Sequence, residues 1–257
     1  MNLFHRDLGG AGLPPLVVLH GFLGSSRNWQ AAGGELSAGF HVLAPDLRNH
    51  GASPHSEVMS YEAMTGDLLD WLNEQDLPRA TFLGHSMGGK VAMLLACRHP
   101  GRVESLAVVD IAPKAYFWPE RREEFAAMAE IDLSTLSSRA EAEKILERRV
   151  PDWALRRFLL TNLERLEGGG WRWLANLPVL SRELPALEKS PLGPGDSFPG
   201  PALFITGGKS RYVEPGDHAE ILRHFPAAAI RTIPGSAHNP HMETRGEFVS
   251  LIRNLSV

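Results

Sequence analysis

Short runs of apolar residues recur along the first part of the chain, and each run ends at a glycine or a polar loop. Such runs are typical of buried strands, because a strand covered on both faces is apolar throughout and turn residues end it. We predict strands at residues 16–20, 41–46, 80–84 and 104–110. Apolar residues at helical spacing predict helices at 61–76 and 88–100. This alternation indicates a mostly parallel central sheet flanked by helices, an α/β fold.

The pattern changes between residues 111 and 200, where we expect helices and no strand. Apolar spacing and helix-tolerant prolines predict helices at 119–132, 137–150 and 151–168. The last of these helices is expected to carry an apolar stripe formed by Leu155, Phe158, Leu159, Leu163 and Leu166.

Alternation of strands and helices resumes with the apolar run at residues 201–208 and continues to the helical segment 247–255. The helical block is therefore an insertion between two strands. We predict a core formed by residues 1–111 and 200–257, and an inserted helical cap formed by residues 112–199. Within the insertion, Gly168 to Gly170 are interpreted as a hinge, and the Pro/Gly-rich residues 190–201 as a linker.

Composition narrows the class of protein. The chain has 257 residues, of which 43% are hydrophobic and 22% charged, as in ordinary soluble domains. The formal charge of -4 argues against nucleic acid as a partner. No apolar run is long enough to span a bilayer and the N-terminus lacks a signal core, so we expect no membrane partner and a cytoplasmic location. The single cysteine, Cys97, lies in an apolar helical stretch and is expected to be inert.

Residues 81–91, TFLGHSMGGKV, fit two kinds of active site. A phosphate-binding P-loop requires a Ser or Thr hydroxyl directly after its lysine to bind magnesium, but Val91 follows Lys90. A nucleophile elbow requires G-x-S-x-G between a strand and a helix, and Gly84 to Gly88 satisfy this pattern in the expected place. The sequence therefore favours Ser86 as a nucleophile.

A serine hydroxyl becomes a good nucleophile only when a base removes its proton. In enzymes with this kind of elbow, the nucleophile, the acid and the histidine base follow one another along the chain. The loop PGSAHNPHM offers His238 as the base, with His241 as its competitor. We favour His238 because it is the first histidine after the preceding strand. The segment HGFLGS places Phe22 after the first apolar strand, and we predict an oxyanion hole made by the backbone N–H groups of Phe22 and Met87.

The acid that orients the histidine has two candidate locations. Its usual place is the loop after the strand at 201–208, but Ser210 stands there. The strand before the insertion ends in AVVD, which brings Asp110 to the carboxyl edge of the sheet beside the nucleophile. We predict that Asp110 orients His238 and that Ser210 adds a hydrogen bond, with Glu214 and Asp217 as alternative acids.

With these residues identified, the chain resembles the α/β-hydrolase superfamily, and within it the YbfF-type esterases. The motifs that carry the resemblance extend over nearly the whole chain: HGFLGS, PDLRNHGAS, GHSMGGK, VVDIAP, the W-R-x-x-x-N-L-P-V-L stretch and FITGGKSRYV. The resemblance implies a triad of Ser86, Asp110 and His238 with Ser210 as a fourth polar partner. It also implies a helical cap over the pocket. For Asp46, Arg48 and His50, in PDLRNHGAS, we expect loop-bracing roles.

Aromatic and basic residues are concentrated in the insertion. We consider Trp118, Trp153 and Trp173 as substrate-binding residues in an acyl or aryl pocket, although they could equally seal the cap onto the sheet. The arginines of this region fit a solvated helix face, or recognition of a phosphorylated thioester carrier such as coenzyme A.

These observations predict a serine hydrolase that cleaves carboxylic esters, and accessible thioesters, through an acyl-enzyme. We expect a small-molecule ester or thioester as the partner, and no cofactor or metal. An acyltransferase, a perhydrolase or a lyase could use the same triad, and a receptor-like protein could retain a slow hydrolase site. The sequence leaves the oligomeric state open between monomer and dimer.

Overall fold

The computed structural model describes residues 1–254 and contains a seven-stranded central sheet. Residues 255–257, which end the predicted core segment, lie outside the described residues. The strand order is β1-β3-β2-β4-β5-β8-β9, and every neighbouring pair is parallel except β1 and β3. The strands are β1 (His5–Asp7), β2 (Pro15–Leu19), β3 (His41–Pro45), β4 (Ala80–His85), β5 (Val103–Val109), β8 (Ala202–Gly207) and β9 (Ala228–Ile233). The predicted mostly parallel sheet is confirmed, and the short antiparallel β1 is an addition to it.

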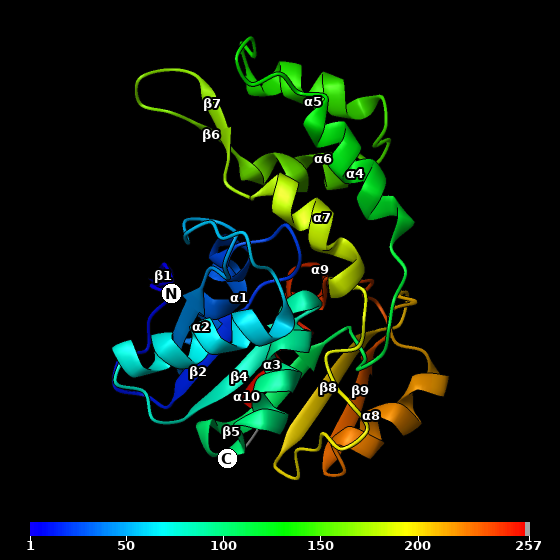
Figure 1. Cartoon of the computed structure of the whole chain (residues 1–257). Helices are drawn as coiled ribbons and strands as arrows, with labels where there is room; N and C mark the ends of the chain where they lie inside the picture. Colours follow the sequence, from blue (N-terminus) through cyan, green and yellow to red (C-terminus); the bar gives the residue numbers. More distant parts are fainter. Residues whose placement is uncertain (255–257) are drawn as a thin grey trace.

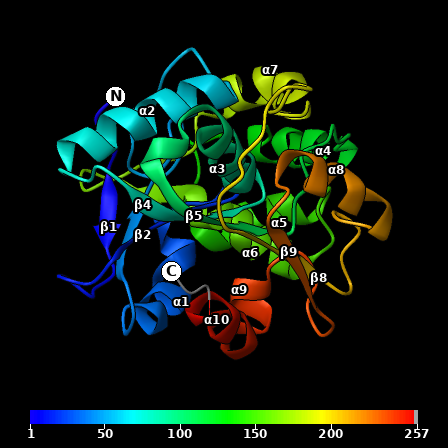
Figure 2. The ribbon, with the colours of Figure 1, turned by 90° about the horizontal axis from the view of Figure 1, so that it is seen from below.

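Helices cover both faces of this sheet, as Figure 2 shows with α2 and α3 on one side and α1 and α10 on the other. The helices of the core are α1 (Gln30–Leu36), α2 (Tyr61–Glu74), α3 (Met87–Arg98), α8 (His218–His224), α9 (Pro240–Glu243) and α10 (Arg245–Arg253). Side chains alternate along β2, so that Val17 packs into one apolar cluster with α2 and α3, and Val18 into a second with α1 and α10. Burial of both faces explains why the strands are apolar throughout.

The elements between β5 and β8 lie together above the sheet in Figure 1. They are α4 (Pro119–Ala129), α5 (Arg139–Glu147), α6 (Trp153–Leu159), β6 (Leu163–Arg165), β7 (Trp171–Trp173) and α7 (Leu177–Leu187). We refer to these elements as the cap. Four short 3-10 helices complete the described elements, at Ser26–Trp29, Pro100–Arg102, Leu160–Asn162 and Pro215–Asp217.

Three expectations about the insertion are wrong: it contains two strands where none was expected, its third helix is shorter, and its glycines are not a hinge. The long helix expected at 151–168 ends at Leu159, and residues 163–165 pair instead with residues 171–173 as an antiparallel hairpin. Leu163 therefore belongs to a strand, although its spacing from the preceding leucines is helical. The glycines interpreted as a hinge form the hairpin connection, in which Gly169 and Gly170 have φ of 89° and 83°. A left-handed backbone at two successive residues favours glycine strongly.

Lys90, a core residue, contacts the segments at both ends of the cap. It follows the nucleophile elbow in α3 and is fully buried. Its ammonium nitrogen donates to the carbonyl oxygen of Lys189 at 2.7 Å, just beyond the C-terminus of α7, and lies 4.9 Å and 5.3 Å from the rings of Tyr116 and Trp118. Carbonyl groups at a helix C-terminus and aromatic faces both attract a cation. The lysine of the rejected P-loop alternative is thus occupied at the connection between core and cap.

Candidate active site

The turn between β4 and α3 places Ser86 at the carboxyl edge of the sheet. Ser86 has φ of 51° and ψ of -117°, a strained conformation that projects the side chain out of the turn. The flanking glycines allow this turn to be tight. A Cβ atom on Gly84 would lie 2.3 Å from the carbonyl oxygen of Gly88, and one on Gly88 would lie 2.6 Å from the carbonyl oxygen of Leu19. The G-x-S-x-G pattern is therefore required by backbone contacts on both sides of the serine.

Asp110 follows β5 and contacts His238. Its Oδ2 atom lies 2.8 Å from Nδ1 of His238 and accepts a hydrogen bond of 2.5 Å from the Ser210 hydroxyl. Its Oδ1 atom accepts from the backbone N–H of Gly207 at 3.0 Å. The carboxylate is buried and its backbone φ is 51°, a left-handed conformation that aspartate tolerates better than most residues. Segments after three strands, β5, β8 and β9, thus meet at one carboxylate.

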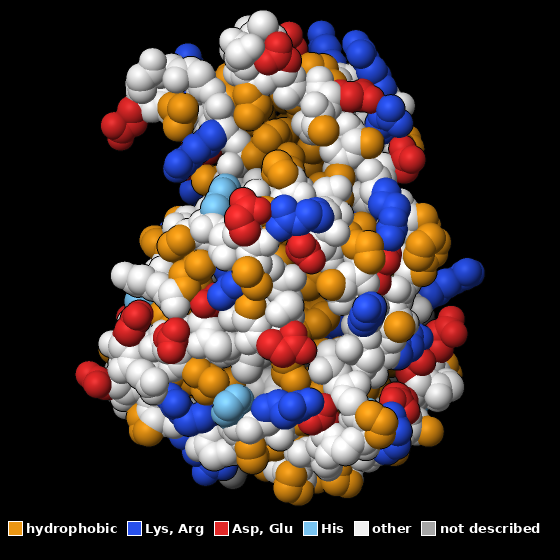
Figure 3. Space-filling view, viewed as in Figure 1, with side chains coloured by type: hydrophobic (Ala, Val, Ile, Leu, Met, Phe, Trp, Pro, Cys, Tyr) orange, Lys and Arg blue, Asp and Glu red, His pale blue; other side chains and the backbone are white. Residues whose placement is uncertain are grey.

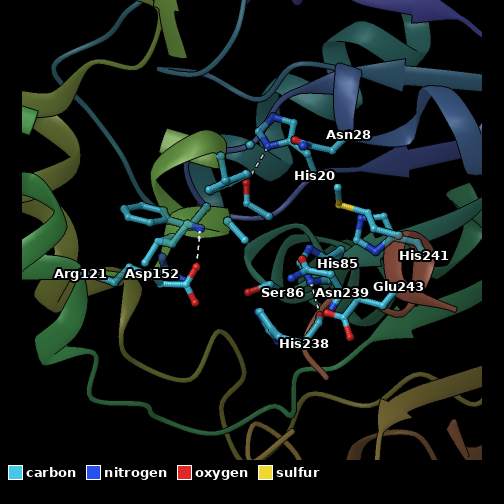
Figure 4. A pocket seen from close by; sticks show the side chains of 17 residues that line it. His20, Asn28, His85, Ser86, Arg121, Asp152, His238, Asn239, His241 and Glu243 are labelled. Carbon is cyan, nitrogen blue, oxygen red and sulfur yellow. Dashed lines mark hydrogen bonds between the residues drawn. The ribbon is translucent and has the colours of Figure 1, made fainter. Parts of the chain in front are cut away.

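Ser86 and His238 line the same cavity, of about 440 Å³, and lie next to each other in Figure 4. The ring of His238 is stacked on Tyr212, with the ring centroids 3.7 Å apart and the planes 17° apart. Because Nδ1 of His238 is hydrogen-bonded to Asp110, Nε2 is the ring nitrogen that remains available for proton transfer in the cavity. The arrangement brings together all four residues that were predicted from the sequence for proton transfer.

Two further side chains fix the loop that carries His238. Nε2 of His85 donates to the carbonyl oxygen of His238 at 2.8 Å. The carboxylate of Glu243 accepts from the backbone N–H groups of Ala237 and Asn239, at 2.6 Å and 3.1 Å. The backbone on both sides of the histidine is therefore held in place, which restricts the orientation of its ring.

The loop after β2 lies against Ser86. A Cβ atom on Gly21 would be 2.8 Å from Nδ1 of His85 and 3.4 Å from Cβ of Ser86. The adjacent Phe22 makes no hydrogen bond from its N–H to a backbone carbonyl within the described residues. Met87 is the first residue of α3, where amide groups have no acceptor inside the helix. The two predicted donors therefore belong to segments that meet beside Ser86.

The other histidines near the site are uncharged at neutral pH because they are buried. Burial lowers the pKa of His241 and that of His50 to about 3, and holds the pKa of His85 well below its usual range. His20 accepts the N–H of Leu47 at Nε2, at 2.9 Å, and its Nδ1 donates to the carbonyl of Gly21. His241, the competing base, is stacked on Trp29 at 4.4 Å and has no contact with Asp110 among the hydrogen bonds of the described chain.

Polar contacts brace the loop that follows β3. Asp46 accepts the backbone N–H groups of Ser26 and Ala52, at 2.6 Å and 2.8 Å. Arg48 donates to both carboxylate oxygens of Asp67, at 2.6 Å and 2.8 Å. These contacts fit the bracing roles expected for this loop.

The cavity wall on the cap side combines the apolar Ala154, Leu155 and Phe158 with one cation, Arg121, and one carboxylate, Asp152. Leu155 and Phe158 come from α6 and face the core residues of the site. Arg121, from α4, also lines the cavity and donates to both oxygens of the buried Glu124, at 2.9 Å and 2.6 Å. An apolar wall with a few polar groups is typical of a site for small organic molecules.

The three tryptophans predicted to bind substrate do not line this cavity. Trp118 is buried beside Lys90, Trp153 is 63% exposed, and Trp173 lies on the hairpin strand β7. The alternative that such aromatics seal the cap onto the core fits Trp118.

The arginines of the cap are mostly paired with glutamates. Figure 3 shows basic and acidic side chains interspersed on this part of the surface. The pairs are Arg122 with Glu188, Arg149 with Glu130 and Glu123, Arg156 with Glu147, and Arg157 with Glu143. The pairs of Arg122, Arg149 and Arg157 fit the expected solvated helix faces, whereas Arg156 is buried and does not. The alternative acid Asp217 is also occupied, since it accepts from Lys114 at 2.7 Å.

Two other properties of the described residues bear on the site. Residues 1–254 contain no group of three His, Cys, Asp or Glu side chains arranged to hold a metal ion. Within the same range, the helices are too short or too polar to cross a membrane. Cys97 is half-buried in α3, and burial raises its pKa to about 12, so its thiol is unreactive at neutral pH.

Comparison with known proteins places this geometry in a family. The pattern of the alpha/beta hydrolase fold matches residues 14–244. The chain belongs to the α/β-hydrolase family. It is 39% identical to the mouse sn-1-specific diacylglycerol lipase ABHD11, over 95% of this chain and 81% of the mouse protein. It is 36% identical to esterase YbfF of Escherichia coli K12, over 93% of this chain and 91% of that esterase.

A solved structure agrees with these relatives. A marine microorganism esterase superposes with a TM-score of 0.94 at 37% identity, over 99% of both chains. The predicted α/β-hydrolase fold and the resemblance to YbfF-type esterases are confirmed. Because these similar relatives are esterases and a lipase, the protein is a carboxylic-ester hydrolase.

Sequence reasoning missed several residues of this α/β-hydrolase site. His85 could have been found, because it occupies the first variable position of the elbow and immediately precedes the nucleophile. Tyr212 and Glu243 act through loops whose paths are fixed by tertiary contacts, and no local pattern marks them. Leu155 and Phe158 were identified only as part of an apolar stripe.

Proposed function

We propose that Ser86, His238 and Asp110 hydrolyse carboxylic esters through an acyl-enzyme, with Ser210 supporting Asp110. The single observation that carries this proposal is the 2.8 Å contact between Nδ1 of His238 and Asp110, with the histidine and Ser86 lining one cavity. A buried carboxylate on one ring nitrogen favours the tautomer that leaves the other nitrogen free to accept a proton.

In the acylation step, Oγ of Ser86 attacks the ester carbonyl carbon while Nε2 of His238 takes the hydroxyl proton. The carbonyl oxygen becomes an oxyanion, and the N–H groups of Phe22 and Met87 are the proposed donors to it. The C–O bond to the alcohol then breaks, and His238 returns the proton to the leaving oxygen. Asp110 stabilises the imidazolium between these two transfers.

In the deacylation step, a water molecule gives a proton to His238 and attacks the acyl carbonyl carbon. As the second tetrahedral species collapses, the bond between the acyl carbon and Oγ of Ser86 breaks, His238 returns its proton to Oγ, and the carboxylic acid is released. A thiolate is a better leaving group than an alkoxide, so the same residues also suit small-molecule acyl thioesters. We propose that residues 1–111 and 200–257 form the core and that the insertion 112–199 acts as a cap. The cap would shield the active-site cavity from solvent.

Labelling with a fluorophosphonate, followed by peptide mass spectrometry, tests the proposal. We expect modification of Ser86, no labelling of Ser86→Ala, and full labelling of the matched control Ser250→Ala, which changes an exposed serine of α10. Turnover of p-nitrophenyl esters of increasing acyl length should disappear in Ser86→Ala and persist in the control. Labelling at another serine, or near-stoichiometric ester consumption by the wild type, would contradict the proposal.

A further inference from the structure

A second cavity, of about 470 Å³, adjoins the active-site cavity on the side of α10. We call it the arginine groove, because Arg27, Arg139 and Arg245 line it. These arginines come from the start of the chain, from the cap and from the C-terminal region. The other residues that line it are Ser25, Asn28, Gln30, Ala31, Thr161, His241 and Met242.

The charge of the arginine groove is poorly neutralised. None of its lining residues is acidic. Arg245 pairs with Glu35 at 2.6 Å, whereas Arg27 and Arg139 have no ion pair with a carboxylate of residues 1–254. Arg139 is held by the carbonyl oxygens of Leu160 and Leu163, the latter at 2.6 Å, which leaves its charge uncompensated. Most cap arginines have a glutamate partner, so two arginines without one in the same cavity are unusual for the molecule.

The arginine groove lies directly beside the active-site cavity. Asn28, His241 and Met242 line both cavities. The Asn28 side-chain oxygen accepts the N–H of Ser25, which holds the wall between the cavities. A substrate with its reacting carbonyl at Ser86 would reach the groove by passing these three residues. An anionic group in the groove would then be part of the same substrate molecule.

We infer that the arginine groove binds a phosphate group carried by the alcohol or thiol part of the substrate. This inference rests on the proposed ester hydrolysis at Ser86. Guanidinium groups are suited to phosphate because their fork of N–H donors matches two phosphate oxygens. The phosphate is assigned to the leaving group, since the apolar wall formed by Leu155 and Phe158 suits the acyl chain.

Two sources offer this chemistry: a phosphorylated glycerol lipid and a phosphorylated thiol carrier. Two matched pairs of substrates separate the phosphate from the rest of the molecule. The first pair is 1-lauroylglycerol and 1-lauroylglycerol 3-phosphate, and the second is lauroyl pantetheine and lauroyl 4′-phosphopantetheine. In each pair, the ratio of kcat/KM with phosphate to kcat/KM without it is measured at low salt.

We expect at least one pair to give a ratio of about ten or more, because charge-assisted contacts of this kind are strong. Arg27→Gln should reduce this ratio toward one. Arg27 is exposed and makes no side-chain hydrogen bond in the described chain, so this change tests charge without disturbing packing. Arg139→Gln gives a second estimate, and Arg231→Gln, an exposed arginine of β9 that lines neither cavity, should keep the wild-type ratio. The pair with the larger ratio identifies the source of the phosphate.

A ratio near one for both pairs in the wild type would overturn the inference, as would a ratio that Arg27→Gln leaves unchanged. Failure of the proposed function gives a different result. In that case neither member of either pair is hydrolysed, while glycerol 3-phosphate still binds Ser86→Ala in calorimetry and binds more weakly when Arg27→Gln is added. Absence of that calorimetric binding would overturn the phosphate site by itself.

Discussion

Replacing Lys90 with methionine should change how the stability of the protein depends on pH. The ammonium group of Lys90 is buried at the connection between α3 and the end of α7, and its nearest carboxylate is that of Glu188. Burial lowers the pKa of Lys90 to about 7, against the smaller raising effect of Glu188. In the unfolded chain the same group has a pKa of about 10.4.

The sign of the effect follows from proton binding. Between about pH 7 and about pH 10.4 the unfolded chain holds the Lys90 proton and the native protein has released it. The unfolded state therefore binds more protons in this window, and the free energy of unfolding rises with pH. With these two pKa values, the contribution of Lys90 grows by about 3 kcal/mol between about pH 6.5 and about pH 9.5. Methionine has similar length and no charge, so the variant lacks this contribution.

Urea denaturation at the two pH values, followed by circular dichroism, measures the effect. The wild type should gain about 3 kcal/mol more than Lys90→Met on going to the higher pH. Lys144→Met, which changes an exposed lysine of α5, is the matched control and should behave as the wild type does. If Lys90→Met gains as much stability as the wild type, the inferred burial of an easily deprotonated lysine at the cap connection is wrong.

Four further substitutions test the site and its surroundings. Ser210→Ala removes one of the hydrogen bonds to Asp110 and should lower kcat about tenfold. Asp110→Asn should lower kcat about a thousandfold or more in the same steady-state assay. Equal effects of the two substitutions on kcat would contradict the assigned roles. Gly88→Ala places a methyl group against the carbonyl oxygens that follow β2 and should lower the free energy of unfolding by about 2 kcal/mol or more, measured in urea. An unchanged urea midpoint would argue against the described tight turn. Phe158→Ala enlarges the cavity at its apolar wall and should shift the preferred ester toward longer acyl chains in a kcat/KM series. An unaltered chain-length profile would exclude Phe158 from the site that binds the acyl chain.

The core was predictable because its information is local. An apolar run such as residues 16–20 specifies a doubly covered strand by itself, and the elbow pattern specifies the turn around Ser86. Asp110 was also within reach, since neighbouring parallel strands end at one edge of the sheet and any carboxylate there approaches the nucleophile. Contacts such as that of Glu243 with Ala237 needed the folded loop and left no local pattern.

The cap was predicted less well, because its structure depends on contacts between distant segments. The leucines near residue 163 keep a helical spacing, yet pairing with Trp171 to Trp173 across a glycine turn gives a hairpin. Residues with high strand propensity follow Gly168 to Gly170 in the sequence, and they were a usable indication of that hairpin. Trp118 could not be assigned from sequence, since its location depends on Lys90, 28 positions earlier in the chain.

The position of the proposed acid, Asp110, directly after β5 has a consequence for how this enzyme can be altered. The segment between β8 and α8 needs to supply only a hydroxyl and an aromatic face to the proton-transfer residues, and no charge. Residues inserted beyond Tyr212 would lengthen that segment without moving the carboxylate, which is anchored to a different strand. This stretch can therefore change in length while the arrangement of Asp110 and His238 is preserved.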